Sequence, residues 1–226
     1  MIRTNWIRLR RKWKRINAPG FILEVIREDY IPFVSLPPPK HDVNNLSAIK
    51  EVDFVCEAIL DLLKMNCIEE LSKVPNIAKP LSVSIQSSGK KRLILDLRHV
   101  NLFVYKQKFK CEDLRVTLSI ISRGFSLFKF DLKSGYHQVE IFPGHRKFLA
   151  FSCVFDAGII RYFQFAVHPF GLSSAPYLFT KLFRPLVKVW RCHVIPIVAF
   201  LDDGLSGGAT RVNCQNSQLE GAYRLT

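Results

Sequence analysis

The chain has 226 residues, of which 48% are hydrophobic and 12% aromatic, and its formal net charge is +14. This composition excludes a disordered chain, and a folded protein this basic usually binds a polyanion, either nucleic acid or an anionic membrane surface. The longest purely apolar run, at residues 194–201, is far shorter than the roughly 20 residues that span a bilayer, so we expect no membrane insertion.

Residues 1–44 are predicted to be a basic extension with a proline-rich linker. Apolar residues recur at steps of three and four in its first half: Trp6, Leu9, Trp13 and Ile16. This period predicts a helix over residues 1–20. Its basic residues either surround a helix docked through its tryptophans or form an RNA-contacting arm or a nuclear-import patch. A mitochondrial transit peptide is a further reading of this acid-free start, which lacks the apolar core of a secretory signal.

Helical and strand-like patterns then alternate without a regular βαβ repeat, which favours an α+β fold. Helical periods cover residues 21–30, 46–71 and 173–190, and Ser173 and Ser174 are candidate N-caps of the last helix. Strand-like runs cover residues 82–84, 92–97, 125–132, 148–155, 161–167 and 194–201, and a glycine-rich exit follows the last run. A stiff proline-rich connector at residues 35–42 separates the first helices from the later elements, and we place a domain boundary after residue 44.

The cysteines form no C-x-x-C pair and complete no zinc pattern with histidine. They are Cys56, Cys67, Cys111, Cys153, Cys192 and Cys214. We therefore expect free thiols, as in a reducing compartment.

Acidic residues are scarce, with 19 Asp and Glu among 33 Lys and Arg. Asp202 and Asp203 directly follow the apolar run at residues 194–201, and Asp131 follows the run LFKF. Carboxylates at the ends of buried strands cost free energy unless they are paired or bind a cation. If the two strands are neighbours, the acids converge, and converging oxygen ligands in a basic protein indicate Mg²⁺.

Two Mg²⁺ ions about 4 Å apart clamp an in-line phosphoryl displacement, in which a 3′-hydroxyl attacks and pyrophosphate leaves. Catalysis of this kind consists mainly of positioning and charge stabilisation. Two other readings of the acids stay open: solvated turn residues, and the ligands of a two-metal nuclease.

Four segments follow one another along the chain: RLILDLRHVN (92–101), FKFDLKSGYHQVEI (128–141), HPFGLSSAPYLF (168–179) and AFLDDGL (199–205). In order and spacing they resemble the successive motifs of the reverse transcriptase family. The last resembles its tyrosine-x-Asp-Asp box, with Phe200 in the tyrosine place. Longer stretches, such as EELSKVPNIAKPLSVSIQSSGKKRLILDLRHVN and FTKLFRPLVKVWR, resemble the polymerases of DIRS-type tyrosine-recombinase retrotransposons.

The resemblance implies the α+β fold of a right-hand polymerase, with fingers and a partial palm at residues 45–208 and an antiparallel palm sheet backed by helices. The sequence after Gly208 stops resembling the family. We therefore expect a C-terminally truncated chain without a thumb, in which residues 209–226 form a poorly ordered tail. The implied activity is that of an RNA-directed DNA polymerase, a nucleotidyltransferase that uses an RNA template, a DNA primer and dNTPs in the cytoplasm or the nucleus.

The resemblance also assigns the catalytic residues. Asp131 matches the first metal-binding carboxylate of the family, and Asp202 and Asp203 match the acidic pair, so the three are expected to hold two Mg²⁺ ions with help from the Leu132 carbonyl. The ring of Phe200, although it lacks the tyrosine hydroxyl, is expected to pack beneath the primer.

The contacts to the incoming dNTP are implied in the same way. They are Arg92, Lys90 and Lys91, the backbone at Leu132, Ser134 and Gly135, the ring of Tyr136, and the loop at Phe170 and Gly171. Arg92 would grip triphosphate oxygens in a two-pronged manner. Tyr136 would exclude a 2′-hydroxyl, and Gly171 would allow close backbone approach.

The expected absence of a thumb leaves another reading open. The chain would then be a catalytically inactive retroelement remnant that only binds nucleic acid, with an affinity that depends on salt.

Overall fold

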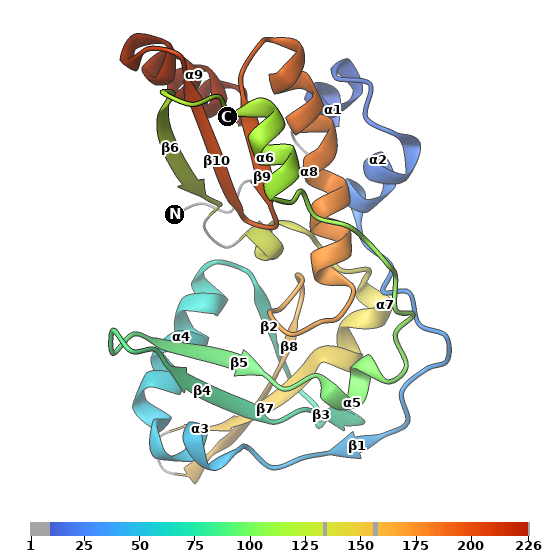
Figure 1. Cartoon of the computed structure of the whole chain (residues 1–226). Coiled ribbons are helices and arrows are strands. Elements are labelled where there is room, and N and C mark those ends of the chain that lie inside the picture. The colour runs from blue at the N-terminus through green and yellow to red at the C-terminus, as the bar shows by residue number, and fades with distance from the viewer. Residues whose placement is uncertain (1–9, 133–134, 156–157, 226) are drawn as a thin grey trace. The chain divides into compact units, whose positions relative to one another are not determined.

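Figure 1 shows a computed structural model of the chain, which describes residues 10–132, 135–155 and 158–225. The chain forms two compact units. The first contains residues 24–106 and 136–175, and the second contains residues 10–23, 107–135 and 176–225. Because the units interleave along the chain, the boundaries at residues 44 and 208 are not edges of either unit and remain predictions about the sequence.

The first unit combines helices with mostly antiparallel strands. Its elements are α2 (Gly20–Arg27, shared with the second unit), β1 (Lys40–His41), α3 (Leu46–Lys50), α4 (Val52–Lys64), β2 (Ile68–Leu71), β3 (Ile77–Ala78), β4 (Leu81–Ile85), β5 (Lys91–Leu95), α5 (Arg98–Asn101), η1 (Gly135–Gln138, also shared), α7 (Pro143–Arg146), η2 (Lys147–Leu149), β7 (Ala150–Val154) and β8 (Ile160–Phe165). The main sheet has the order β2–β8–β7, while β4 and β5 pair as a hairpin and β1 pairs with β3 in parallel. Helix α4 buries Val55, Ile59 and Leu62, which share one face at helical spacing.

Two predicted strand pairs of the first unit are confirmed. The β4–β5 hairpin closes around the expected Gln-Ser-Ser-Gly turn, where the Gln86 amide donates to the Lys90 carbonyl at 3.0 Å. The strands predicted at residues 148–155 and 161–167 are β7 and β8, and they are paired in antiparallel register.

The prediction of one helix over residues 46–71 is wrong at its end. Helix α4 stops at Lys64, and the chain reverses at Asn66, whose φ is 54°. The two glutamates expected near the helix end lie on β2 instead, where Glu70 accepts two hydrogen bonds from Arg161 at 2.6 and 2.7 Å. The apolar pattern continued in the sequence because Cys67 and Ile68, which follow the helix, are also buried.

The second unit is an antiparallel sheet backed by helices. Its elements are α1 (Arg10–Arg15), α6 (Leu114–Ile120), β6 (Ser126–Asp131), α8 (Ala175–Cys192, from Pro176 on), β9 (Ile197–Phe200), β10 (Asp203–Gly208) and α9 (Arg211–Leu225). The strand order is β6–β10–β9. Helix α8 buries Phe183, Val187 and Trp190 against one face of this sheet, which includes Phe130 and Ala199. Figure 1 shows α8 running beside β9.

The glycine-rich exit predicted after the acidic turn is instead strand β10. A side chain at Gly204 would collide with the ring of Phe130, its partner on β6. The glycine therefore makes room for an aromatic ring in the sheet and does not mark a loop.

The two ends of the described chain each contain a helix. Of the helix predicted over residues 1–20, the described part is α1, with Trp13 buried, and the chain turns at Asn17, whose φ is 51°. Residues 1–9, including Trp6 and Leu9, lie outside the described residues. Helix α9 lies in the segment 209–226 and contacts β10 and β6, and the expected poor order of this segment stays a prediction.

Helix α8 confirms the helix predicted over residues 173–190, but the expected capping is wrong. Neither Ser173 nor Ser174 makes a side-chain hydrogen bond to another described residue, and the Ser174 hydroxyl is buried. The first turn is closed by the backbone, because the Ala175 amide donates to the Leu172 carbonyl at 3.1 Å. In the part of the chain that the structure describes, no helix combines the length and the hydropathy needed to cross a membrane.

Candidate active site

Two of the three predicted acids lie directly opposite each other in the second unit. Asp131 ends β6, Asp203 begins β10, and the two are register partners. Directly opposed residues of an antiparallel pair project to the same face, so both carboxylates lie on the face that does not carry α8. Both residues are exposed, so neither carboxylate is buried at the end of its strand.

The third acid occupies the turn between β9 and β10. The backbone carbonyl of Asp202 accepts a hydrogen bond from the Leu132 amide at 2.8 Å, which ties the turn to the end of β6. Leu201 has a φ of 54°, a left-handed conformation that leucine rarely adopts. Such strain commonly accompanies functional sites, and here it lies next to the acids.

The aromatic residue of the acidic box lies beside these acids. Phe200 is the register partner of Asp203 on β9 and is 54% exposed. It therefore shares the carboxylate face of the sheet, where a flat apolar ring is available to a bound molecule.

The donor set at this edge fits a divalent cation in chemistry. Two like charges in direct cross-strand opposition repel unless a cation lies between them, and carboxylate oxygens are the ligands that Mg²⁺ prefers. Within the described ranges, however, no group of three or more His, Cys, Asp or Glu side chains is close enough to hold a metal. The predicted convergence of all three acids is thus seen as a cross-strand pair with Asp202 in the adjoining turn.

The predicted dNTP residues Tyr136, Phe170 and Gly171 lie together in the first unit. The rings of Tyr136 and Phe170 meet edge to face at 5.4 Å, with Tyr136 nearly buried and Phe170 44% exposed. Gly171 has a φ of 100°, and a Cβ there would lie 3.1 Å from the Leu95 carbonyl oxygen. Glycine is therefore required by the backbone at this position.

Sequence reasoning gave no role to Asn101, which holds this loop. Its side-chain amide donates to the Gly171 carbonyl at 2.8 Å, and its side-chain oxygen accepts from the Ser173 amide at 2.9 Å. The two bonds fix the backbone on both sides of Leu172. Asn101 is the last residue of the RLILDLRHVN segment, and this position in a motif was the one sign in the sequence that its side chain has a role.

The three predicted cations of the hairpin differ in their surroundings. Lys91 forms an ion pair with Glu51 and lies 5.9 Å above the centre of the Phe54 ring. Arg92 and Lys90 are exposed, and neither side chain has an ion-pair partner among the residues that the structure describes. Only these two are therefore available to a phosphate without breaking an existing contact.

The backbone contacts proposed around Leu132 are changed by the structure. The Gly135 amide donates to the Leu132 carbonyl at 3.0 Å, so in this conformation the amide is not available to a phosphate. The Leu132 carbonyl keeps a second lone pair for a cation. Ser134 lies outside the described residues.

The first unit also contains buried polar pairs that the sequence did not reveal. The imidazole of His168, at the start of the HPFG segment, lies 2.8 Å from the Asp29 carboxylate, and both residues are buried. The Lys79 ammonium is fully enclosed and donates to Asp42 at 2.9 Å and to His99 at 3.3 Å. Each partner is far away in sequence, so periodicity carries no signal for these contacts.

The ion pairs shift the ionisation of the Lys79 cluster, which consists of Lys79, Asp42, His99 and Lys40. Burial would raise the pKa of Asp42, but hydrogen bonds from Lys79 and Lys40 hold this pKa below its ordinary value. The pKa of His99 is lowered, first by burial and then by the charges of Lys79 and Lys40. The cluster is therefore built around an ionised aspartate and a neutral histidine.

Comparison with known proteins places these features in a family. The sequence pattern of the family described as "Reverse transcriptase (RNA-dependent DNA polymerase)" matches residues 77–219. That range contains the three acids and every predicted dNTP contact.

Curated relatives and a solved structure agree with this match. The genome polyprotein of Petunia vein clearing virus (isolate Shepherd) is 35% identical over 120 residues, which are 53% of this chain and 5% of the polyprotein. The Transposon Tf2-3 polyprotein of Schizosaccharomyces pombe is 28% identical over 194 residues, 84% of this chain and 13% of that protein. The fold resembles the crystal structure of Prototype Foamy Virus Protease-Reverse Transcriptase, with a TM-score of 0.65 and 20% identity over 88% of this chain and 25% of that one.

Proposed function

This chain belongs to the reverse transcriptase (RNA-dependent DNA polymerase) family, and from that premise we propose that it adds deoxynucleotides to the 3′-hydroxyl of a DNA primer on an RNA template. By family it is a nucleotidyltransferase. The observation that carries the proposal is the cross-strand pairing of Asp131 with Asp203, with Asp202 in the adjoining turn. The chain spans only 5% and 13% of the two polyproteins above, so their other activities are not transferred.

In this proposal the three acids hold two Mg²⁺ ions. Bound Mg²⁺ supplies the charge stabilisation for an in-line displacement that releases pyrophosphate. Asp131 and Asp203 provide oxygens from opposite strands, Asp202 from the turn, and Leu132 its carbonyl. The exposed ring of Phe200 offers an apolar platform on the same face for the primer end.

The contacts to the triphosphate of the incoming dNTP are proposed from the resemblance to the family. Arg92 and Lys90 bind the triphosphate, together with backbone amides at Ser134 and Gly135. Lys91 would join them only after leaving Glu51, and the Gly135 amide only after leaving the Leu132 carbonyl.

The sugar of the dNTP is assigned to Tyr136, which acts as the steric gate against a 2′-hydroxyl. Phe170 and Gly171 support the nucleotide and the template base. The edge-to-face contact between the rings of Tyr136 and Phe170 supports this part of the proposal, because it fixes the orientation of both rings.

The experiment is single-nucleotide incorporation on a primed RNA template with Mg²⁺, comparing the wild-type chain with Asp131→Asn and Asp203→Asn. Both substitutions should reduce incorporation about 100-fold or more, because each removes a metal-ligating charge. Asp61→Asn is the matched control, since Asp61 is exposed and forms an ion pair with Lys64 at 3.3 Å. Equal incorporation by Asp131→Asn and wild type would refute the assigned site.

A direct metal measurement keeps the test decisive if incorporation by the wild type is low. Mn²⁺ should broaden NMR signals of residues around the β6 and β10 ends, and this broadening should disappear in Asp203→Asn. Broadening that is unchanged in that variant would place the metal elsewhere.

The second candidate is a retroelement remnant that binds nucleic acid without chemistry. The net charge of +14 and the lack of a three-residue metal group among the described residues favour it. It predicts that RNA affinity falls steeply between low and high salt through counterion release, with no incorporation by the wild type. Affinity that is the same at both salt concentrations would exclude it.

Three finer assignments complete the proposal. The element is of the DIRS type, residues 1–44 are a basic extension of a fingers and palm region at residues 45–208, and the polymerase acts in the cytoplasm or the nucleus. The resemblance of stretches such as FTKLFRPLVKVWR supports the first of these.

A further inference from the structure

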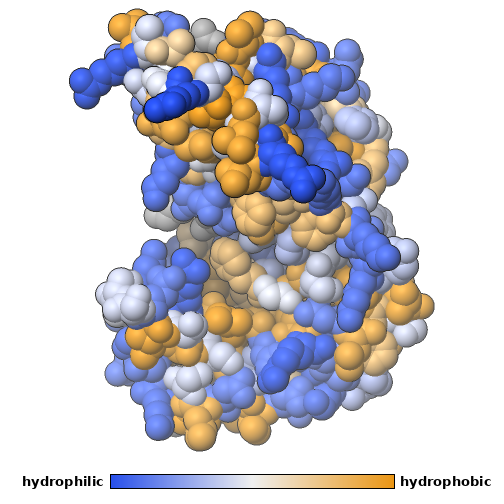
Figure 2. Space-filling model, in the orientation of Figure 1, coloured by the Kyte–Doolittle hydropathy of each residue, from blue (hydrophilic) through white to orange (hydrophobic). Residues whose placement is uncertain are grey.

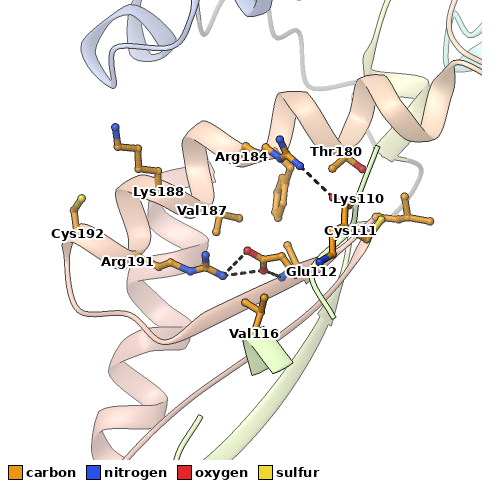
Figure 3. Close-up of a pocket in the computed structure, with 13 residues that line it drawn as sticks. Lys110, Cys111, Glu112, Val116, Thr180, Arg184, Val187, Lys188, Arg191 and Cys192 are labelled. Carbon is orange, nitrogen blue, oxygen red and sulfur yellow. Dashed lines mark hydrogen bonds and ion pairs between the residues drawn. The ribbon is translucent and has the colours of Figure 1, made fainter. Parts of the chain in front are cut away.

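A cavity of about 660 Å³ opens in the second unit between α8, residues 110–116 and β9 (Figure 3). Its volume is in the range of about 300–1,000 Å³ that is usual for small-molecule sites. Apolar side chains form much of its lining: Val116, Phe183, Val187, Ala199 and Leu201. It shares no residue with the acids or the predicted dNTP contacts, and Ala199 places it on the α8 face of the sheet, opposite the carboxylates.

One wall of the cavity is an ion pair that is already satisfied. Arg191 donates to both oxygens of Glu112, at 2.7 and 2.8 Å, and to the Ile197 carbonyl. Glu112 also accepts from the Ala199 amide at 2.9 Å. The pair is therefore neutral and held in place, and it anchors residues 110–116 to β9 (Figure 3).

Two other cations of the lining lack a carboxylate partner. Within the described ranges Arg184 makes one hydrogen bond, to the Lys110 carbonyl at 3.1 Å, which leaves most of its donors without a described partner. Lys188, one turn further along α8, is exposed and has no ion pair with any described residue, and Figure 3 shows it pointing outward. Helix α8 contains no acidic residue that could neutralise them.

We infer that this cavity binds a small organic anion with an apolar body, such as an aromatic or aliphatic sulfonate or carboxylate. The apolar lining residues contact the apolar part of the ligand and bury its surface. Arg184 and Lys188, at the cavity opening, bind the anionic group. Figure 2 shows hydrophobic and hydrophilic residues side by side over α6 and α8, which matches a ligand with both characters. A polyphosphate would not contact the apolar lining, and a neutral apolar molecule would leave Arg184 and Lys188 without an anionic partner.

The cavity also lies next to β9 and the turn that carries Asp202. Ala199 lies on β9, and Leu201 directly precedes Asp202 in the strained turn. A bound apolar body would therefore restrain the turn that carries the acid, so occupancy should change nucleotide incorporation. This consequence rests on the proposed function, whereas binding itself does not.

The experiment uses naphthalene-2-sulfonate as the probe and calorimetry as the measurement. We expect the wild-type chain to bind it and the double variant Arg184→Gln/Lys188→Gln to bind roughly 10- to 100-fold more weakly. Lys181→Gln is the matched control on the same helix, because Lys181 does not line this cavity. It should bind as the wild type does, and circular dichroism confirms that each variant is folded.

The neutral analogue naphthalene-2-sulfonamide tests the anion preference. It should bind the wild type about as weakly as the sulfonate binds the double variant. Equal affinity of the two compounds for the wild type, or sulfonate binding unaffected by the double variant, would overturn the inference. Loss of RNA affinity in the double variant without loss of sulfonate affinity would also overturn it, because the cations would then be a phosphate-binding surface. All of these readings are independent of incorporation, so they stand if the proposed activity fails.

Discussion

In the Lys79 cluster of the first unit, a fully enclosed ammonium has Asp42 and His99 within hydrogen-bonding distance. At the hairpin of the second unit, Asp131 and Asp203 face each other in the open. In the first arrangement the buried charge already has partners within the protein. The second leaves two like charges to repel, so it carries a cost that a bound cation would remove. The difference is therefore between a charge that has partners within the protein and charges that do not.

The largest expected effect on the free energy of unfolding comes from removing the buried charge of the Lys79 cluster. Lys79→Met keeps the aliphatic volume but leaves Asp42 without its buried partner, and we expect a loss of about 2–4 kcal/mol in the free energy of unfolding. Lys40→Met is the control, because Lys40 also bonds Asp42 at 2.9 Å but is 49% exposed, so about 0–1 kcal/mol is expected. Urea unfolding measures both, and equal losses would show that burial of the Lys79 ammonium is unimportant.

A smaller effect is expected at Asn101, a half-buried residue of the first unit whose side chain bonds the backbone. Asn101→Ala removes the two hydrogen bonds to the Gly171 loop and should cost about 1–3 kcal/mol. If Asn101 positions this loop for a nucleotide, the KM for dNTP should rise more than kcat falls. A change confined to stability would make Asn101 a structural residue only.

The pH dependence sharpens the comparison further. The pKa of His99 is lowered in the folded chain, so the unfolded chain binds more protons as pH falls towards and below the ordinary value of 6.5. The stability from neutral His99 is therefore complete above that pH and is lost as pH falls through the folded pKa. Urea unfolding between pH 7.5 and 5 should show this loss, and Lys79→Met should reduce it because one cause of the shift is removed. An unchanged slope in the variant would contradict the coupling.

The smallest expected effect is a gain in the free energy of unfolding, whereas the other substitutions reduce it. Asp203→Asn relieves the repulsion across β6 and β10, so without divalent metal at low salt it should stabilise the chain by about 0.2–1 kcal/mol. Added Mg²⁺ should stabilise the wild type by mass action and leave the variant unchanged. If the substitution destabilises the chain under both conditions, the acids are structural and the contrast with the Lys79 cluster is lost.

Local patterns predicted much of the fold. The β4–β5 hairpin, the β7–β8 pair and α8 all follow from periodicity and turn residues. The prediction failed where a neighbour in space decides the structure. Gly204 lies in a strand in which the Phe130 ring occupies the place of its side chain. Glu70 lies in a strand that pairs with β8, where its carboxylate bonds Arg161. Helix α9 was missed because its sequence has a weak apolar period.

By itself, the sequence determined the family and predicted which residues would form a polymerase site, because the order and spacing of motifs are linear properties of the chain. The tertiary structure decided which charges are paired and which are open. It placed Asp131 opposite Asp203, enclosed Lys79 with Asp42 and His99, tied Asn101 to the Gly171 loop, and left Arg184 and Lys188 beside a cavity. Each of these contacts depends on packing between segments that are distant in the sequence. Burial and distance set the strength of a charge interaction, and both are defined only once the chain has folded.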